Sequence, residues 1–542
     1  MSKKTFVGGA AILGIAGLIT KAIGALYRIP LTNIIGEQGM GIYQTVYPVY
    51  ALLLTVSTTG IPTAISKLVS AKHAKGDYRG AHRVFRTALV LMVLIGAVLA
   101  AAMYFASGWL AHAMEDPEAA IAFQAISPAV FFVAVLCAFR GYFQGQQIMM
   151  PTASSQLMEQ AGKLAIGLAL AAAWLPMGVQ WGAAGTLLGV SLSEVAALVL
   201  LVGIYVFTAR PRRELMRHSI RVPYSQRPSF KELSLKLAVI AVPVTIGGAI
   251  MPIIGFIDAA IIKGALLDIG YALESARSLF GILTGVVNPL VAMPTVLSSA
   301  LQMSLVPAIS HAKERRDKKG VRVSALVGTK LAIYIALPCA VGMFVLADPI
   351  IRCLYSGLQP ENIPVSVQLL QQMAAGVLFL SLVQTLTGVL QGLGKVTVPV
   401  FNLLVGAVFK VILSIVLIRV PSINISGAVV GTIVCYVVAS GLNLWQVYRR
   451  THMPFRIMDC VVKPVIASAV MGAFAYFFNL WLLPVLGKWV ALAVGIIGGA
   501  LAYVVMILIL GGISREDLDM LPGGSRLKRF VRQKEPDDRR EQ

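Results

Sequence analysis

Apolar side chains run along this chain in long blocks that are separated by short polar segments. Blocks of about 20 residues match the hydrocarbon core of a bilayer at the rise of an α-helix. The pattern predicts about fourteen membrane-spanning helices, near residues 6–29, 41–70, 84–110, 121–143, 154–176, 181–207, 234–262, 277–308, 323–347, 367–391, 396–418, 425–448, 458–483 and 487–510. The predicted fold class is an all-α integral membrane protein.

Composition agrees with this pattern. Of 542 residues, 57% are hydrophobic and 13% are charged, whereas a soluble domain carries about 25% charged residues. The first apolar block follows Lys3 and Lys4 and continues to Ile29 without a small-residue cleavage site. We therefore interpret it as an uncleaved first helix, not as a signal peptide.

Positive charge gathers in every second loop. The net charge is +22, and its basic loops follow predicted helices 2, 6, 8 and 12, with a further basic tail at 514–542. The intervening loops are short or acidic, with Glu37, Asp116 and Glu361 as examples. The positive-inside rule then places both termini in the cytoplasm. Charge spread over many membrane-flanking loops also argues against a nucleic-acid partner.

The chain repeats itself. Gly141–Gly145 (GYFQG) matches Gly388–Gly392 (GVLQG) at an offset of 247 residues, and Lys163 matches Lys410 at the same offset. Ser70 and Asp77 match Ser310 and Asp317 at an offset of 240. The matches predict two six-helix lobes in the same orientation, 1–230 and 231–455, followed by an extra helix pair at 456–510 and a basic tail at 511–542.

Ionisable residues inside the predicted spans are the candidate functional positions, because burying a charge in a bilayer is costly. Lys21 and Arg28 are seven residues apart on the first helix, which is about two helical turns and therefore one face. Either can line a cavity, and Arg28 can instead extend to the interface. Lys67 and Arg140 lie near helix ends, where we expect the same extension toward the interface.

The matched lysines have different surroundings. Glu159 and Lys163 are spaced for an i,i+4 ion pair, and Glu194 on the next helix falls at the depth of Lys163. We interpret these three residues as a structural ion cluster, with Glu194 also a possible coupling site. The turn after Lys410 places Thr432 or Ile433 opposite it, so Lys410 is a candidate ligand for an anion.

Two residues of the second predicted lobe leave alternatives open. Asp258 is either a coupling-ion site or a rim partner of Lys263. Arg277 is either a cavity cation or an interfacial anchor. Together the candidate cavity cations Lys21, Arg28, Lys410 and Arg277 outnumber unpaired acids, which favours an anionic substrate.

Catalytic and metal-binding patterns are not found. The chain has no GxxxxGK[ST], HExxH or GxSxG motif, so we expect no enzymatic activity. Its five cysteines are scattered without a CxxC spacing, and its six histidines lie in or beside loops. We therefore expect no resident cofactor or metal, and transport driven by Na⁺, H⁺ or the membrane potential.

Four segments carry a family resemblance: residues 34–39 (IIGEQG), 60–70 (GIPTAISKLVS), 140–145 (RGYFQG) with Pro151, and 305–310 (LVPAIS). They resemble the stage V sporulation protein B and MurJ-like branch of the polysaccharide exporters, within the superfamily that includes multidrug-and-toxin exporters. The resemblance implies a bacterial cytoplasmic-membrane protein with fourteen helices, alternating access, and export of an undecaprenyl-pyrophosphate-linked sugar, foremost lipid II for peptidoglycan. We expect a monomer that contacts membrane lipids, with cell-wall synthesis proteins as candidate partners.

The first helix departs from the family pattern. Lipid II flippases carry a basic residue, Leu-Gly and then Arg-Asp, whereas this chain has Lys21-Ala22-Ile23-Gly24, Arg28 shifted by one and no following Asp. Lysine lacks the bidentate fork of arginine. Two alternatives remain open: a cation-coupled drug exporter, which needs Asp258, and a scaffold for cell-wall synthesis, which needs the tail.

Overall fold

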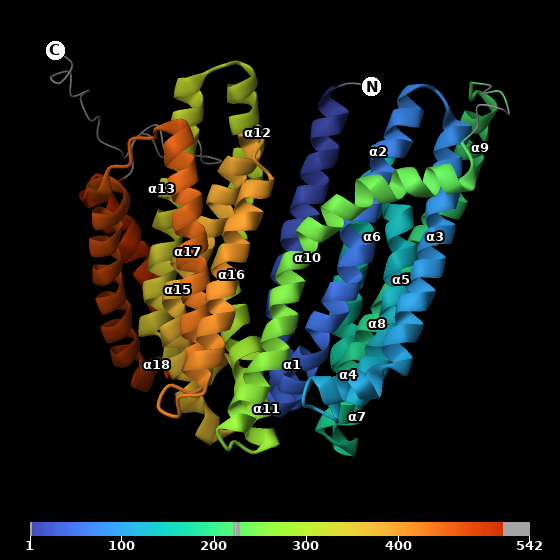
Figure 1. Ribbon diagram of the computed structural model, residues 1–542. Helices are drawn as coiled ribbons and strands as arrows, with labels where there is room; N and C mark the ends of the chain where they lie inside the picture. The colour runs from blue at the N-terminus through green and yellow to red at the C-terminus, as the bar shows by residue number, and fades with distance from the viewer. Residues whose placement is uncertain (1–2, 221–222, 224–227, 513–542) are drawn as a thin grey trace, which may run out of the picture. The chain divides into compact units, whose positions relative to one another are not determined.

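The computed structural model describes residues 3–220, 223 and 228–512. Within these residues the regular secondary structure is helical (Figure 1). The expected basic residues Arg221 and Arg227 and the tail beyond 512 lie outside the described residues.

Contacts divide the chain into two compact units. The first contains Met1–Val286 with Gly357–Gln359 and Ile415–Ile425. Its helices in chain order are α1 (Lys3–Thr55), η1 (Val56–Gly60), α2 (Ile61–Ala74), α3 (Tyr78–Phe105), α4 (Ser107–Ala113), α5 (Ala119–Gly145), α6 (Met150–Gly162), η2 (Lys163–Gly167), α7 (Leu168–Trp174), η3 (Leu175–Met177), α8 (Val179–Phe207), α9 (Ala209–Arg217), α10 (Phe230–Asp268), α11 (Leu273–Gly281) and most of η5 (Ile282–Val287).

The second unit contains Val287–Ser356, Pro360–Ser414 and Ser426–Gln542. Its helices are α12 (Asn288–Glu314), α13 (Lys318–Val345), α14 (Ala347–Leu354), η6 (Pro360–Asn362), α15 (Ile363–Gly392), most of α16 (Thr397–Ile418), α17 (Ser426–Thr451), η7 (Met458–Val462) and α18 (Lys463–Ile509). The predicted lobes and these units are different divisions of the chain, because α10 and α11 pack against α1 in the first unit.

Thirteen helical stretches of the described residues are long and apolar enough to span a membrane. The expected count of about fourteen agrees with this number, because one stretch, Ile12–Thr55, contains the first predicted helix and the start of the second. These two parts of α1 meet at Gly36, which has a positive φ of 66° and breaks the helix. Gly487, with φ 73°, divides α18 into the predicted last two spans in the same way.

The repeat is visible in how the helices pack within each unit. In the first unit, Gly141 and Gly145 of α5 let α2 approach, and a Cβ at Gly145 would lie 2.7 Å from the Cβ of Val69. In the second unit, Gly392 of α15 faces α12, and a Cβ there would lie 2.8 Å from the Cβ of Ile309. Ile309 follows Val69 by the repeat offset of 240 residues.

Helix capping repeats at the same offset. Asp77 accepts a hydrogen bond from the backbone N–H of Gly80 at 2.8 Å and begins α3, and Asp317 accepts one from Gly320 at 2.8 Å and begins α13. Both helices are 28 residues long. An aspartate that satisfies the free N–H groups of a first turn fixes where the helix starts.

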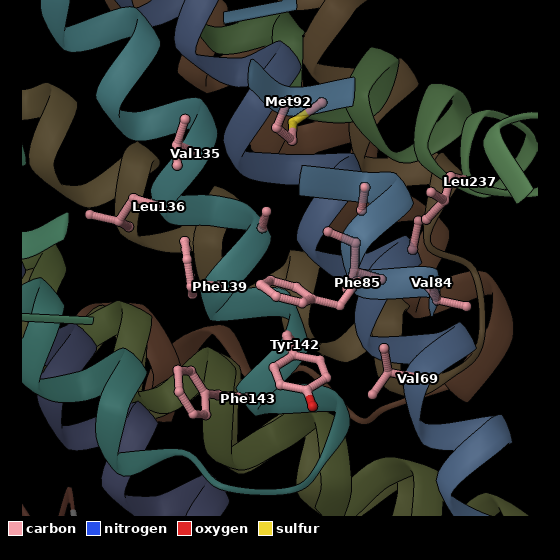
Figure 2. Packing of buried hydrophobic residues seen from close by; sticks show 14 of the residues in the cluster. Val69, Val84, Phe85, Met92, Val135, Leu136, Phe139, Tyr142, Phe143 and Leu237 are labelled. Carbon is pink, nitrogen blue, oxygen red and sulfur yellow. The ribbon is translucent and has the colours of Figure 1, made fainter. Parts of the chain in front are cut away.

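An aromatic cluster fills the basic-loop end of the first unit. Phe85 of α3 stacks on Tyr142 of α5, with ring centroids 4.5 Å apart, and meets Phe139 edge-on at 5.2 Å. Figure 2 shows these rings between α3 and α5, with Val69 of α2 and Leu237 of α10 beside them. Aromatic pairs at these distances contribute beyond their buried area, so this end of the unit is firmly packed.

Candidate functional site

The cations of the first span lie on α1. Lys21 is exposed and Arg28 is half-buried. The Nη1 atom of Arg28 lies 3.4 Å from the carbonyl oxygen of Thr284, which also accepts a hydrogen bond from Gln44 Nε2 at 2.5 Å. Thr284 belongs to the π-helical segment η5, and such segments occur often at functional sites.

A second group of charges, here called the Glu159 cluster, consists of Arg140, Ser155, Glu159, Lys163 and Glu194. Lys163 Nζ lies 2.5 Å from Glu159 Oε1 and 3.5 Å from Glu194 Oε1. Arg140 contacts Glu159 Oε2 at 3.2 Å and donates to Ser155 Oγ at 2.9 Å. Two acids balance two bases, which is how buried charges are tolerated.

The structure therefore brings together the three residues of the expected ion cluster. It also corrects the expectation for Arg140, whose surface is only 9% exposed. The side chain does not extend to the interface because Glu159 and Ser155 hold it inside the unit. In the described part of the chain, Glu194 Oε2 and the hydroxyl groups of Tyr27 and Tyr50 are buried without a hydrogen-bond partner.

A third group, here called the Asp116 cluster, consists of Thr45, Asp116, Glu118, Lys263 and Arg277. Asp116 lies between α4 and α5 and is fully buried, as is Lys263 of α10. Asp116 contacts Lys263 Nζ at 3.1 Å and Arg277 Nη2 at 2.7 Å. Lys263 also donates to Thr45 Oγ1 at 2.8 Å, and Arg277 reaches Glu118 at 2.8 Å.

The Asp116 cluster joins segments that are distant in sequence. The α4–α5 loop and α1 come from the first predicted lobe, whereas Lys263 and Arg277 come from α10 and α11. Glycines let the backbones of α1 and α11 touch: a Cβ at Gly281 would collide with the carbonyl oxygen of Glu37. Close backbone approach through small residues is typical of helix contacts in membranes.

These contacts bear on two candidate site residues, Arg277 and Asp258. Arg277 is 2% exposed and is engaged by two acids in this conformation, so it does not present a free cation. The ammonium group of Lys263 is bound by Thr45 and Asp116, while Asp258 is half-buried on the same helix.

In the second unit the candidate is Lys410 of α16, which is 7% exposed. Gly431 of α17 lies beside it, and a Cβ at Gly431 would be 2.9 Å from the carbonyl oxygen of Lys410. Nearby on the same helix pair, Asn402 donates to Asn443 Oδ1 at 2.8 Å, and both are buried.

Sequence reasoning missed the burial of Asp116. It treated the acids of the α4–α5 loop only as markers of the non-basic side. The sequence could have indicated this burial, because Lys263 and Arg277 are cations on apolar helices and require acidic partners from another segment. No group of three or more possible metal ligands occurs among residues 3–220, 223 and 228–512.

Comparisons with known proteins define the class. A family model described as "Polysaccharide biosynthesis protein" matches residues 6–313, and the MatE model matches residues 283–416. The fold is similar to that of the lipid II flippase MurJ in an inward closed conformation, with a TM-score of 0.70, 15% identity, and coverage of 92% of this chain and 98% of that one. An inward-facing multidrug resistance MATE family transporter of the MOP superfamily gives a TM-score of 0.65 at 14% identity, covering 82% and 98%. The protein is therefore a multi-pass membrane protein with a fold similar to those of MurJ and of a MATE transporter of the MOP superfamily.

The chain belongs to the polysaccharide biosynthesis protein family, whose model matches more than half of it. Among its Bacillus subtilis relatives, the uncharacterized membrane protein YabM is 30% identical over 97% of both chains. Stage V sporulation protein B is 27% identical over 96% of this chain and 98% of its own. The lipid II flippase MurJ is 25% identical over 87% and 88%, respectively.

Proposed function

We propose that this transporter is a flippase that moves an undecaprenyl-pyrophosphate-linked sugar precursor, foremost lipid II, from the inner to the outer leaflet by alternating access. The pyrophosphate and sugar enter a cationic site, and the prenyl chain stays in the lipid. The observation that carries the proposal is the pair of cations on α1, Lys21 and Arg28, in a chain related over most of its length to a lipid II flippase.

Charge and accessibility support an anionic substrate. Lys21 is exposed on a membrane-spanning helix, and the contact that Arg28 makes with a neutral carbonyl leaves its charge uncompensated by that partner. In a setting of low dielectric constant, such cations attract a phosphate strongly. Lys410 of the second unit is proposed as a further anion ligand, whereas Arg277 would first have to leave Asp116.

Cation-coupled drug export is the second candidate. It is supported by the MatE match over residues 283–416 and by the half-buried Asp258 on α10. A drug exporter of this kind needs an acid that exchanges a cation for the drug. Drug resistance that depends on the chain and is lost in Asp258→Asn would favour this candidate over the flippase.

The test is the position of lipid II in cells depleted of the protein and of redundant flippases. We expect lipid II that is accessible to an external probe to fall while the inner pool rises. Re-expression of the chain restores the surface pool. An unchanged surface pool would contradict lipid II as the substrate.

A further inference from the structure

A cavity of about 190 Å³ lies in the first unit where α2, α5 and α8 end and α3 begins, and α9 forms part of its wall. Its wall is formed in part by Tyr78, Tyr142, Phe143 and Met216. An engineered apolar cavity of about 150 Å³ accommodates benzene, so the space is large enough for a chemical group of some size. Figure 2 shows Tyr142 and Phe143 at the last turns of α5, beside the aromatic cluster.

Polar side chains also line this largely apolar cavity. Arg212 of α9 lines the cavity and is held in place by Tyr205: its Nη1 donates to the Tyr205 carbonyl at 2.8 Å, and its guanidinium lies 3.6 Å from the ring centroid. Gln146 and His73 also line the cavity. Burial lowers the pKa of His73, so its imidazole is neutral near pH 7 and offers one N–H donor.

The surroundings of the cavity are strongly basic. The exposed side of α9 carries Arg210, Arg213 and Arg217, whereas Leu215 and Met216 line the cavity. Arg79 of α3 donates to the Met216 carbonyl at 3.0 Å, which ties α9 to the bundle. An amphipathic helix with arginines on its polar face is attracted to anionic lipid at the membrane interface.

The residues that line the cavity differ between the two copies of the repeat. Lys313 occupies the position of His73 at the offset of 240, and Leu393 that of Gln146 at the offset of 247. In the second unit Lys313 Nζ donates to the Leu393 carbonyl at 2.9 Å, so a lysine bridges the equivalent place. In addition, no helix like α9 lies between α17 and η7 in the described residues. The polar lining of the cavity is therefore not a feature that the repeated fold alone produces.

We propose that this cavity binds the phosphate headgroup of an anionic phospholipid, with Arg212, His73 and Gln146 as donors and the aromatic wall against the lipid chain. The site is separate from the α1 cations and does not depend on which substrate is transported. Its role is to fix α9, and with it the ends of α2, α3, α5 and α8, to the basic-loop side of the membrane.

The test uses the full chain in nanodiscs of phosphatidylcholine, with and without phosphatidylglycerol, and measures the thermal unfolding midpoint. Arg213→Ala is the matched control for Arg212→Ala, because both remove one arginine from α9 and only Arg212 lines the cavity. We expect phosphatidylglycerol to raise the midpoint of the natural chain and of Arg213→Ala, and to leave that of Arg212→Ala unchanged. The readout is the change in the unfolding midpoint of each variant when phosphatidylglycerol is added. A general loss of stability in Arg212→Ala lowers both of its midpoints and does not affect this change.

A second variant fills the cavity without removing charge. His73→Lys combined with Gln146→Leu copies the second unit, and we expect it to abolish the phosphatidylglycerol effect as well. Equal losses in Arg212→Ala and Arg213→Ala would overturn the proposal in favour of general surface attraction. So would stabilisation by undecaprenyl phosphate without any effect of phosphatidylglycerol, since the ligand would then be the prenyl lipid.

Discussion

Asp116 is held by two cations in the first unit, and all three groups are almost completely buried. Each cation would be costly in that place without the carboxylate, because a buried unpaired charge loses its hydration. The cluster also links α10 and α11 to the loop before α5. The Asp116 carboxylate therefore stabilises the packing of α10, α11 and the loop before α5 against one another.

Asp116→Asn should lower the free energy of unfolding markedly. It leaves Lys263 without its charged partner, and breaking a buried ion pair costs about 3–5 kcal/mol. Glu118→Gln is the control: Glu118 contacts the same Arg277, but its side chain is 49% exposed, and exposed pairs contribute about 0–1 kcal/mol. Unfolding of both variants in detergent measures the difference, and equal losses would contradict the role given to Asp116.

Lys21→Ala should abolish transport without loss of stability, because Lys21 is exposed and its removal leaves no buried gap. Lys21→Arg should retain activity, since guanidinium also binds phosphate. Lys67→Ala removes another exposed lysine, from α2 of the same unit, and should transport normally. The measurement is complementation of a flippase-depleted strain at matched expression, and growth supported by Lys21→Ala would refute the assignment.

Residue partners were only partly predictable. The Glu159–Lys163 contact follows from the spacing of these residues on one helix. The position of Glu194 near Lys163 could be predicted because both residues lie at the same depth on neighbouring predicted helices. Asp116 could not be placed in this way, because its partners lie 147 and 161 residues further on. Arg140 was misjudged for a related reason: its acid, Glu159, lies on another helix.

At the scale of elements, close approach of α1 and α11 depends on glycine. A Cβ at Gly281 would collide with backbone of α1, and backbone cannot give way as a flexible side chain can. Gly36 breaks α1 with a φ of 66°, a conformation in which residues with a Cβ are strained. The first predicted span and the start of the second are thus two helices separated by a kink within α1.

Gly281→Ala should reduce stability, and Gly17→Ala should not. Gly17 lies on α1 with nothing within 4 Å of an added Cβ, so alanine there gains about 0.5–1 kcal/mol from the unfolded state. Thermal unfolding of the two variants compares the same substitution at a tightly packed position, Gly281, and at an unobstructed one, Gly17. A neutral Gly281→Ala would show that α1 and α11 are not in close contact.

The spans were predictable because block length and apolar composition suffice for membrane helices. The π-helical segments η1, η2, η5 and η7 were not, because they change the backbone without changing the hydrophobic pattern. The short helices α4, α9 and α14 were not predicted as separate elements, since they are too short to cross a bilayer.

Across the whole molecule, the repeat places the same kind of glycine-mediated helix contact in both units. Gly145 of α5 and Gly392 of α15 each allow a neighbouring helix to approach to van der Waals contact. The repeated motif could be found in the sequence because glycine has no substitute at such a contact. The assignment of α10 and α11 to the first unit could not, because it depends on tertiary contacts that the repeat does not determine.

Gly145→Ala and Gly392→Ala should therefore destabilise the chain by similar amounts. The added Cβ meets a β-branched side chain at 2.7 Å in one case and 2.8 Å in the other, and overpacking of this kind costs about 1–3 kcal/mol. Unfolding measured in one detergent gives both values. A loss in only one variant would show that the two contacts are not equivalent.

The proposed function requires that this chain move a prenyl-linked anionic sugar across the bilayer. The most direct measurement uses the purified protein in sealed vesicles with fluorescently labelled lipid II and a membrane-impermeant quencher. With the natural chain, we expect label from both leaflets to become quenched, and with Lys21→Ala we expect the inner-leaflet label to stay protected. Protected inner-leaflet label with the natural, folded chain, under imposed Na⁺, H⁺ or potential gradients, would rule out flippase activity toward lipid II.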